Sequence, residues 1–128
     1  MKEIKHSRVA MLATLGFVAT EFVHLPDHNA GSVEAHNIAV ADGSAFQVLT
    51  VIAALEFIGI VALKQTLEGS GRLPGDFGFD PLGFYNGKSA DQKAKLQAQE
   101  VENGRTAMLA FAGIVTQAVV TGKGFPYF

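Results

Sequence analysis

Two segments of this chain repeat one another at an offset of 97 residues. The copy that begins at residue 3 reads EIKHSRVAMLATLG, and the copy that begins at residue 100 reads EVENGRTAMLAFAG. Seven of the fourteen aligned positions are identical without a gap, and they pair Glu3 with Glu100 and Arg8 with Arg105. A repeat of this kind in a membrane bundle predicts two equivalent helices related by a pseudo-two-fold axis.

The charges inside the repeat predict how the two helices pair. Each copy has Glu, then His or Asn three residues later, then Arg five residues after the Glu. On a helix the first two share a face, whereas the Arg is rotated about 140° from the Glu. Crossing helices would instead bring Glu3 to Arg105 and Glu100 to Arg8. Because charges within a membrane must be paired to be tolerated, we expect these four side chains to form an ion-pair lock.

The apolar residues favour a membrane protein over a soluble helical bundle. They form three blocks, at residues 9–23, 45–63 and 106–120, and the middle block has the length of about 20 residues that a spanning helix needs. The loop at 24–44 has no Lys or Arg, whereas the N-terminal leader and the loop after the second block are basic, which matches the positive-inside pattern. We expect an all-α membrane protein with three transmembrane helices at about 2–24, 45–67 and 91–121.

Composition excludes several other classes of protein. The chain contains no cysteine, which rules out a disulfide scaffold, a zinc–thiolate site and an iron–sulfur cluster. Its net charge is −2, so its charge does not indicate a nucleic-acid binder. No nucleophile–base pair is visible, which leaves an enzyme as a weak alternative.

Polar residues in the spans are spread out instead of converging on one ion. His6 and Asn103 lie one turn after the paired glutamates, Gln117 lies further along the third span, and Gln47 and Glu56 lie on the second. A dedicated metal site needs several ligands together, so single ligands suit a metal whose other positions are filled, such as the magnesium of a chlorophyll. A haem would favour paired His or His/Met ligands. We expect no metal beyond such magnesium.

At these residues the sequence resembles the light-harvesting chlorophyll-protein family. The motifs ExxHSRxAMLAxxG and ExxNGRxAMLAxxG are typical of that family, and so is the loop segment PGDFGFDPLGF at residues 74–84. The resemblance covers nearly the whole chain and implies a single chlorophyll-binding domain over residues 1–128. It implies two long crossed helices, a shorter middle helix, and carotenoids in the grooves of the crossing.

The resemblance also implies roles for individual residues. Five side chains would bind chlorophyll magnesium, and Gln47, about 180° round the helix from Glu56, would serve another pigment or none. The five are Glu3, His6, Glu100, Asn103 and Gln117, with Glu56 as a plausible sixth. Four loop residues would lie beside a carotenoid: Asp80, Pro81, Leu82 and Gly83.

The short loops resemble the chlorophyll a/c branch of red-lineage plastids. This implies chlorophyll a with chlorophyll c and a xanthophyll such as fucoxanthin, peridinin, diadinoxanthin or alloxanthin. It implies a thylakoid protein among lipids, other antenna subunits and the core of photosystem I or II, with the N-terminus and second loop stromal and the first loop and C-terminus lumenal. The chain stops without a further helix after the third span, which departs from the land-plant pattern. It begins only two residues before Glu3, so it looks truncated at the N-terminus.

Two alternatives to an antenna remain open. A photoprotective quencher in the same fold would use lumenal acids that titrate, and the first loop carries Asp27, Glu34 and Asp42. A pigment-poor structural subunit would be held by the ion-pair lock alone. The loop histidines His24, His28 and His36 are expected to be solvated.

Overall fold

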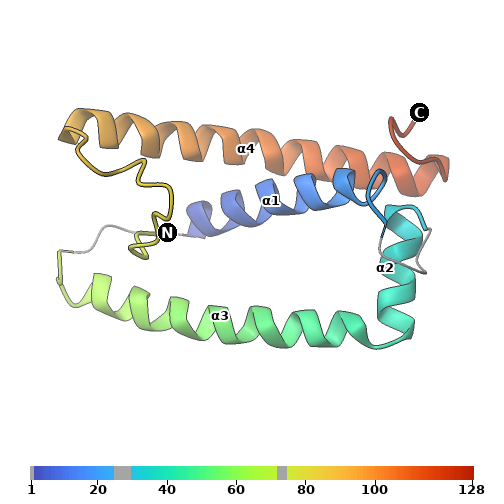
Figure 1. Cartoon of the computed structure of the whole chain (residues 1–128), viewed down its shortest axis with the longest axis horizontal. Helices are drawn as coiled ribbons and strands as arrows, with labels where there is room; N and C mark the ends of the chain where they lie inside the picture. The colour runs from blue at the N-terminus through green and yellow to red at the C-terminus, as the bar shows by residue number, and fades with distance from the viewer. Residues whose placement is uncertain (1, 25–29, 72–74) are drawn as a thin grey trace.

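The computed structural model describes residues 2–24, 30–71 and 75–128, and these residues form α-helices and loops without a strand. The all-helical prediction is therefore confirmed for the described part of the chain. Figure 1 shows four helices in chain order, namely α1 (Lys2–Ala19), α2 (Ser32–Ala41), α3 (Ser44–Leu67) and α4 (Ala90–Thr121).

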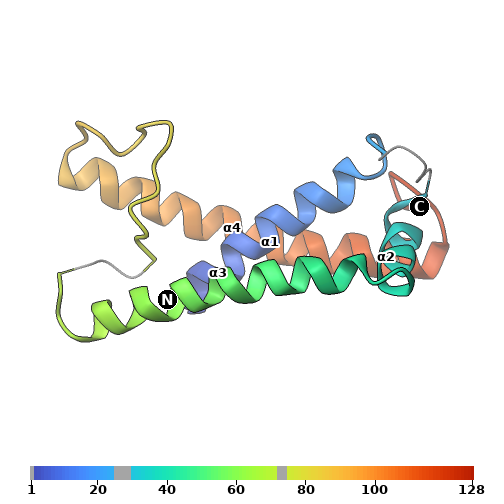
Figure 2. The same cartoon turned by 60° about the horizontal axis from the view of Figure 1, so that its bottom comes forward.

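Helices α1 and α4, which carry the two copies of the repeat, form the packed centre of the molecule. They make by far the most extensive contact between any two elements, and Figure 2 shows them crossing at an angle. Helix α3 lies to one side of this crossed pair, and α2 turns across the end of the molecule to join α1 to α3 (Figure 1).

Short polar side chains and glycines define the helix ends. Ser89 starts α4 with a capping box, in which its hydroxyl accepts the Gln92 N–H and the Gln92 side chain accepts the Ser89 N–H. Gly122 ends α4 with φ 65°, a left-handed conformation that glycine adopts without steric cost. Such caps satisfy backbone groups that a helix end otherwise leaves unpaired.

Two of the described helices are long and apolar enough to cross a membrane. They are α3, with a mean hydropathy of 2.2 in its most apolar window, and α4, with 1.2. Only 11 % of each window is buried inside the molecule, so neither resembles the core helix of a soluble protein. The 32 residues of α4 span about 48 Å, which exceeds a hydrocarbon layer of about 30 Å.

The structure differs from the sequence-based expectations in two respects. The middle helix α3 has 24 residues and is longer than α1, which has 18, although it is shorter than α4. The expectation of a middle helix shorter than both others was therefore wrong, because α3 continues beyond its apolar block through residues 64–67 while α1 ends in a turn at Thr20. The ten-residue α2 was not foreseen, since its weakly patterned sequence was interpreted as loop.

Candidate functional site

The closest approach between α1 and α4 is at one pair of equivalent positions of the repeat. Ser7 is fully buried, and Gly104, 97 residues later, is buried against it. A Cβ added to Gly104 would lie 2.8 Å from the Cα of Ser7, which is closer than two carbon atoms can approach. The missing side chain of Gly104 is therefore what allows the two backbones to meet.

Two ion pairs join the helices on either side of this contact. Arg105 Nε lies 2.7 Å from Glu3 Oε1. Arg8 Nε lies 2.6 Å from Glu100 Oε1, and Arg8 Nη2 donates to Glu100 Oε2 at 3.3 Å. Each Arg reaches the Glu of the opposite helix, which is the pairing that the sequence predicts for a crossed repeat.

The two ion pairs are not equally covered. Arg8 also donates from Nη1 to the carbonyl of Gly75 at 2.7 Å, and its guanidinium lies 5.9 Å from the ring centre of Phe77. The Arg105 side chain is 64 % exposed, against 37 % for Arg8. The loop between α3 and α4 therefore closes one half of the pseudo-symmetric centre and leaves the other open.

A third cross-helix ion pair was not predicted. Lys5 Nζ of α1 contacts Glu56 Oε2 near the middle of α3. Glu56 was expected only as a pigment ligand, and Lys5 only as one of the basic residues at the start of the chain. The signal available in the sequence was that Lys5 aligns with Glu102 and so has no basic counterpart in the second copy of the repeat.

The remaining predicted ligands are spread along the helices. His6, Asn103, Gln117 and Gln47 are all exposed on α1, α4 and α3. In the described part of the chain, no three His, Asp or Glu side chains lie close enough to hold a metal ion together. The arrangement thus offers single donor groups on apolar helices, a donor set that suits a metal already held by a macrocycle.

The segment 80–83 forms a fixed turn around one carboxylate. Asp80 Oδ1 accepts the N–H of Phe84 at 2.9 Å and Oδ2 accepts that of Tyr85 at 2.7 Å. Gly83, with φ 69°, donates its N–H to the Asp80 carbonyl. The neighbouring Leu82 is 75 % exposed, so the turn presents an apolar surface. Pro74, which opens the family motif, lies outside the described residues.

A polar cluster closes the opposite end of the molecule. Glu21, in the turn after α1, accepts hydrogen bonds from the backbone N–H of Ser32 at 2.9 Å and from its hydroxyl at 2.7 Å, and these tie it to the start of α2. Burial acts to raise the pKa of Glu21, but the bonds from Ser32 and the Phe125 N–H outweigh it and lower the pKa below its ordinary value. Burial raises the pKa of Tyr127, which packs beside this cluster.

The acids and histidines expected in the first loop do not converge. Glu34, Asp42, His24 and His36 are exposed at separate points of this end. Asp27 and His28 lie outside the described residues. Sequence reasoning missed Glu21, because it lies near the end of the first apolar block and outside the repeat.

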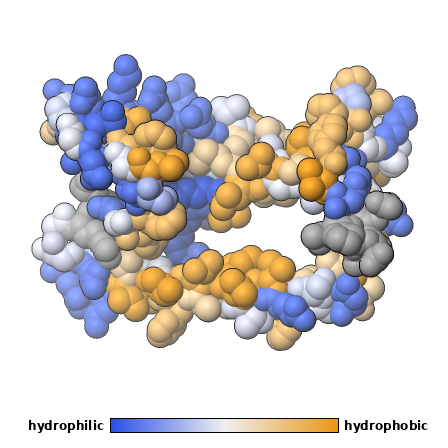
Figure 3. Space-filling view, in the orientation of Figure 1, coloured by the Kyte–Doolittle hydropathy of each residue, from blue (hydrophilic) through white to orange (hydrophobic). Residues whose placement is uncertain are grey.

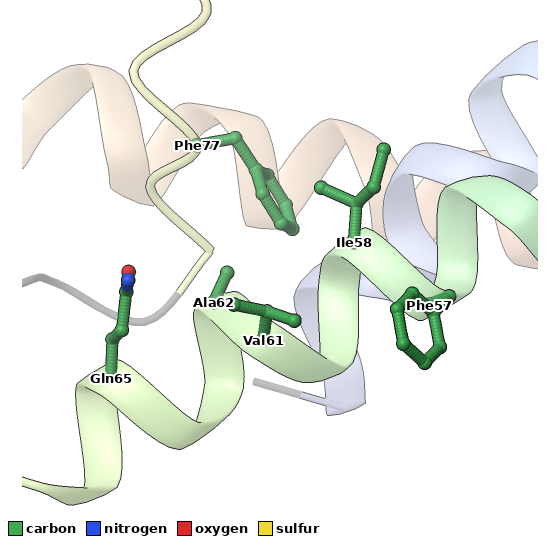
Figure 4. A pocket seen from close by; sticks show the side chains of 6 residues that line it. All are labelled: Phe57, Ile58, Val61, Ala62, Gln65 and Phe77. Carbon is green, nitrogen blue, oxygen red and sulfur yellow. The ribbon is translucent and has the colours of Figure 1, made fainter.

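Large apolar side chains are exposed along the helices, and two openings lie between the elements. Figure 3 shows an open gap between α3 and the crossed pair, bordered by apolar surface. Figure 4 shows a recess of about 450 Å³ where α3 meets the following loop. Phe57, Ile58, Val61, Ala62, Gln65 and Phe77 line it. A protein in water does not leave this much apolar surface uncovered.

Comparison with known proteins places this geometry in context. Residues 1–119 match the family described as chlorophyll A-B binding protein. The chain is 34 % identical to the chloroplastic fucoxanthin-chlorophyll a-c binding protein of Chattonella marina var. antiqua, over 95 % of this chain and 56 % of the relative. It is 35 % identical to the chloroplastic light-harvesting complex stress-related protein 1 of Chlamydomonas reinhardtii, over 92 % of this chain and 52 % of the relative.

A third relative is similar over a shorter stretch. The chloroplastic photosystem I chlorophyll a/b-binding protein 3-1 of Arabidopsis thaliana is 46 % identical over 52 % of this chain and 24 % of its own length. The chain spans about half the length of the curated relatives it matches over most of its residues. By their names these relatives are pigment-binding or light-harvesting proteins and not enzymes.

Proposed function

The chain belongs to the chlorophyll A-B binding protein family, and from that premise we propose that it is a light-harvesting antenna protein of the thylakoid membrane. It binds chlorophylls and carotenoids and passes excitation energy to a photosystem. The proposal involves no bond chemistry. The work of the protein is to fix the distances and orientations between pigments.

One observation carries the proposal, namely the two Glu–Arg pairs across the contact between Ser7 and Gly104. Each carboxylate has about four lone-pair sites, and the Arg uses only part of them. In the Glu3 pair, Arg105 Nε engages Oε1 at 2.7 Å. A neutralised carboxylate with spare acceptor capacity is a suitable ligand for chlorophyll magnesium, a hard cation that prefers oxygen.

The other chlorophyll ligands are assigned from the exposure of their side chains and from the donor atoms that they carry. His6 and Asn103 each lie one turn after a paired glutamate, where an imidazole nitrogen or an amide oxygen can ligate one magnesium. Gln117 serves a further chlorophyll on α4, and Glu56 serves one on α3, with Gln47 as a weaker candidate. All five of these side chains are exposed in the isolated chain, which suits side chains that pigments cover.

The openings between the helices and the apolar side chains around them are suited to bound pigments. The gap between α3 and the crossed pair and the recess of about 450 Å³ are bordered by apolar side chains. Macrocycles, phytyl chains and carotenoids would bury this surface and thereby stabilise the fold by the hydrophobic effect. The turn at Asp80, Pro81, Leu82 and Gly83 places apolar side chains where a carotenoid end can rest.

Helices α3 and α4 are long and apolar enough to cross a membrane, and α1 is added as the third span because it is the partner of α4 in the repeat. Helices α1, α3 and α4 are the three spans, with α2 at the lumenal surface. The basic N-terminus and the loop between α3 and α4 are stromal, as the positive-inside rule predicts. The partners are then thylakoid lipids, other antenna subunits and the core of photosystem I or II, and the relatives named for fucoxanthin-chlorophyll a-c binding support chlorophyll a with chlorophyll c and a xanthophyll.

Pigment analysis of the purified complex tests the proposal. We expect chlorophyll a, chlorophyll c and an allenic or epoxy carotenoid at fixed ratios to the polypeptide, with carotenoid-to-chlorophyll energy transfer in the fluorescence excitation spectrum. Chlorophyll b with lutein would overturn the pigment assignment and keep the function. Preparations without stoichiometric pigment would overturn the antenna function and leave Glu3 and Glu100 as structural residues.

Photoprotective quenching is the second candidate, favoured by the similarity to a stress-related relative over 92 % of this chain. It differs from harvesting in the excited-state lifetime, not in the fold. Fluorescence decay of the pigmented protein at pH 7.5 and pH 5 separates the two. A lifetime that shortens severalfold at pH 5 identifies a quencher, and a long lifetime at both pH values identifies an antenna.

A further inference from the structure

An ion pair between Lys5 and Glu56 links α3 directly to the crossed pair. Helix α3 packs against α2 at one end and makes little other contact with α1 or α4. Glu56 lies near the middle of this long apolar helix. A carboxylate at that depth in a membrane requires a counter-charge, and Lys5 supplies it from another helix.

The face of α3 that carries Glu56 is shaped to receive Lys5. Gly59 and Ala62 are the buried residues of α3, and Gly59 lies three positions after Glu56 on the same face. A Cβ added to Gly59 would lie 3.2 Å from Lys5 Nζ and 3.8 Å from Glu56 Oε2. The absent side chain of Gly59 therefore leaves room for the ammonium group beside the carboxylate.

Lys5 is also the charged residue at which the two copies of the repeat differ in sign. Its equivalent, 97 residues later, is Glu102, whereas the other charges of the repeat are the same in both copies. Helix α3 lies on one side of the crossed pair (Figure 1). A lysine on α1 and a glutamate at the equivalent place on α4 make only the α1 side attractive to the Glu56 carboxylate.

The ion pair uses one oxygen of Glu56. Lys5 contacts Oε2, and among the described residues Oε1 accepts no hydrogen bond. The Glu56 side chain is 54 % exposed, so a ligand can reach it. This is the same chemical state as in the crossed Glu–Arg pairs, where an opposite charge neutralises a carboxylate that keeps acceptor capacity.

We propose that Lys5 is a positioning residue for a chlorophyll held by Glu56, and that the pair fixes the side on which α3 docks. Lys5 holds Oε2 and cancels the charge, which leaves Oε1 to ligate magnesium. The proposal rests on the antenna function above and adds the requirement that this pigment site needs a residue from α1. The rival explanation is a purely structural ion pair, with no pigment on Glu56.

Refolding of the full chain with a chlorophyll a, chlorophyll c and xanthophyll extract separates these two explanations. Lys5→Met is expected to lose one chlorophyll per chain and to melt at a lower temperature. Lys5→Arg is expected to keep the wild-type chlorophyll content and melting temperature. Lys5→Met combined with Glu56→Gln should recover the pigment, because a neutral amide oxygen can ligate without a counter-charge. Lys64→Met, which removes an exposed pair with Glu68 on the same helix, is the matched control and should change neither quantity.

A charge exchange provides the decisive variant and preserves an ion pair for folding. In Lys5→Glu with Glu56→Lys, melting temperature is expected to recover but the chlorophyll is not, since an ammonium group cannot ligate magnesium. Full chlorophyll content in Lys5→Met, or its return in the charge exchange, would overturn the proposal. Wild-type protein without pigment would instead overturn the antenna function itself, and this proposal with it.

Discussion

Ser7 and Gly104 occupy the same position in the two copies of the repeat and touch each other where α1 and α4 cross. The pseudo-two-fold axis of the molecule therefore passes between them. The Glu–Arg pairs lie one turn away on either side, so any change in the spacing at this contact alters both pairs together.

Gly104→Ala should destabilise the fold because the new methyl group meets the backbone of Ser7. We expect a loss of about 1–3 kcal/mol, the usual cost of overpacking, and a lower melting temperature by circular dichroism. Gly113→Ala on the same helix is the control, since a Cβ there has nothing within 4 Å. Equal melting temperatures for the two variants would contradict a tight crossing at Gly104.

Arg8→Leu should be more damaging than Arg105→Leu, although the two residues are equivalent in the repeat. Both leave a glutamate of the opposite helix without its counter-charge, and this costs more in the half-buried Arg8 pair than in the exposed Arg105 pair. Only Arg8 also holds the Gly75 carbonyl and lies over Phe77. Chlorophyll content and melting temperature of the refolded variants measure the difference, and an equal loss would mean that the loop adds nothing to the pair.

Asp80→Ala should loosen the turn between α3 and α4. The substitution removes two acceptors, for the N–H groups of Phe84 and Tyr85, each worth about 1 kcal/mol. Faster hydrogen exchange at these two amides and a lower carotenoid content are expected. Asp76→Ala, which removes one such bond to Gly78, should have the smaller effect, and unchanged exchange in Asp80→Ala would show that the carboxylate does not hold the turn.

Acidification should leave the Glu21 cluster intact well below neutral pH. The hydrogen bonds from Ser32 lower the pKa of Glu21 from its ordinary value of 4.5. A lowered folded-state pKa adds stability above the unfolded pKa, and this is lost as the pH falls through the folded one. The Ser32 amide should thus stay protected from hydrogen exchange at pH 5, and this protection should be lost only as the pH falls through the lowered pKa of Glu21.

Glu21→Gln is the control for this pH dependence. In this variant the Ser32 amide should exchange faster than in the wild type at every pH, and acidification should cause no additional loss of protection. If the wild-type Ser32 amide is already unprotected at pH 5, the carboxylate titrates in the lumenal range and the assignment of a lowered pKa is wrong. With Glu21 ionised at pH 5, any quenching at that pH must depend on other acids.

The sequence accounts for the helical class and the crossed pairing for specific reasons. The spacing of Glu, His or Asn, and Arg leaves the charges of one copy unable to pair within their own helix. They are neutralised only when the Glu of each copy pairs with the Arg of the other copy. The contact of Ser7 with Gly104 has a different reason in the sequence. Both equivalent positions of the repeat carry small residues, which allow the two helix backbones to approach closely. Ligation by His6, Asn103, Gln117, Glu56 and Gln47 stays a prediction, because isolated donors can be recognised in a sequence but not seen to bind.

Other features could not be derived from the order of residues. Helix α2 depends on the bonds of Ser32 to Glu21, which lies eleven residues earlier and outside any motif. The pairing of Lys5 with Glu56 joins residues 51 positions apart, and it depends on where α3 docks and on the space left by Gly59. The closing of only one half of the centre by the loop at Gly75 breaks a symmetry that the repeat alone implies.

The sequence by itself determined the long apolar helices, the family and the two charge pairs across the repeat, because these depend on composition, on period and on charges that have one way to be neutralised. Only the tertiary structure decided which side of the crossed pair α3 occupies, what neutralises Glu56 and how the two ends are closed. These contacts join distant segments through single side chains, and their selection depends on packing in three dimensions, which no local pattern encodes.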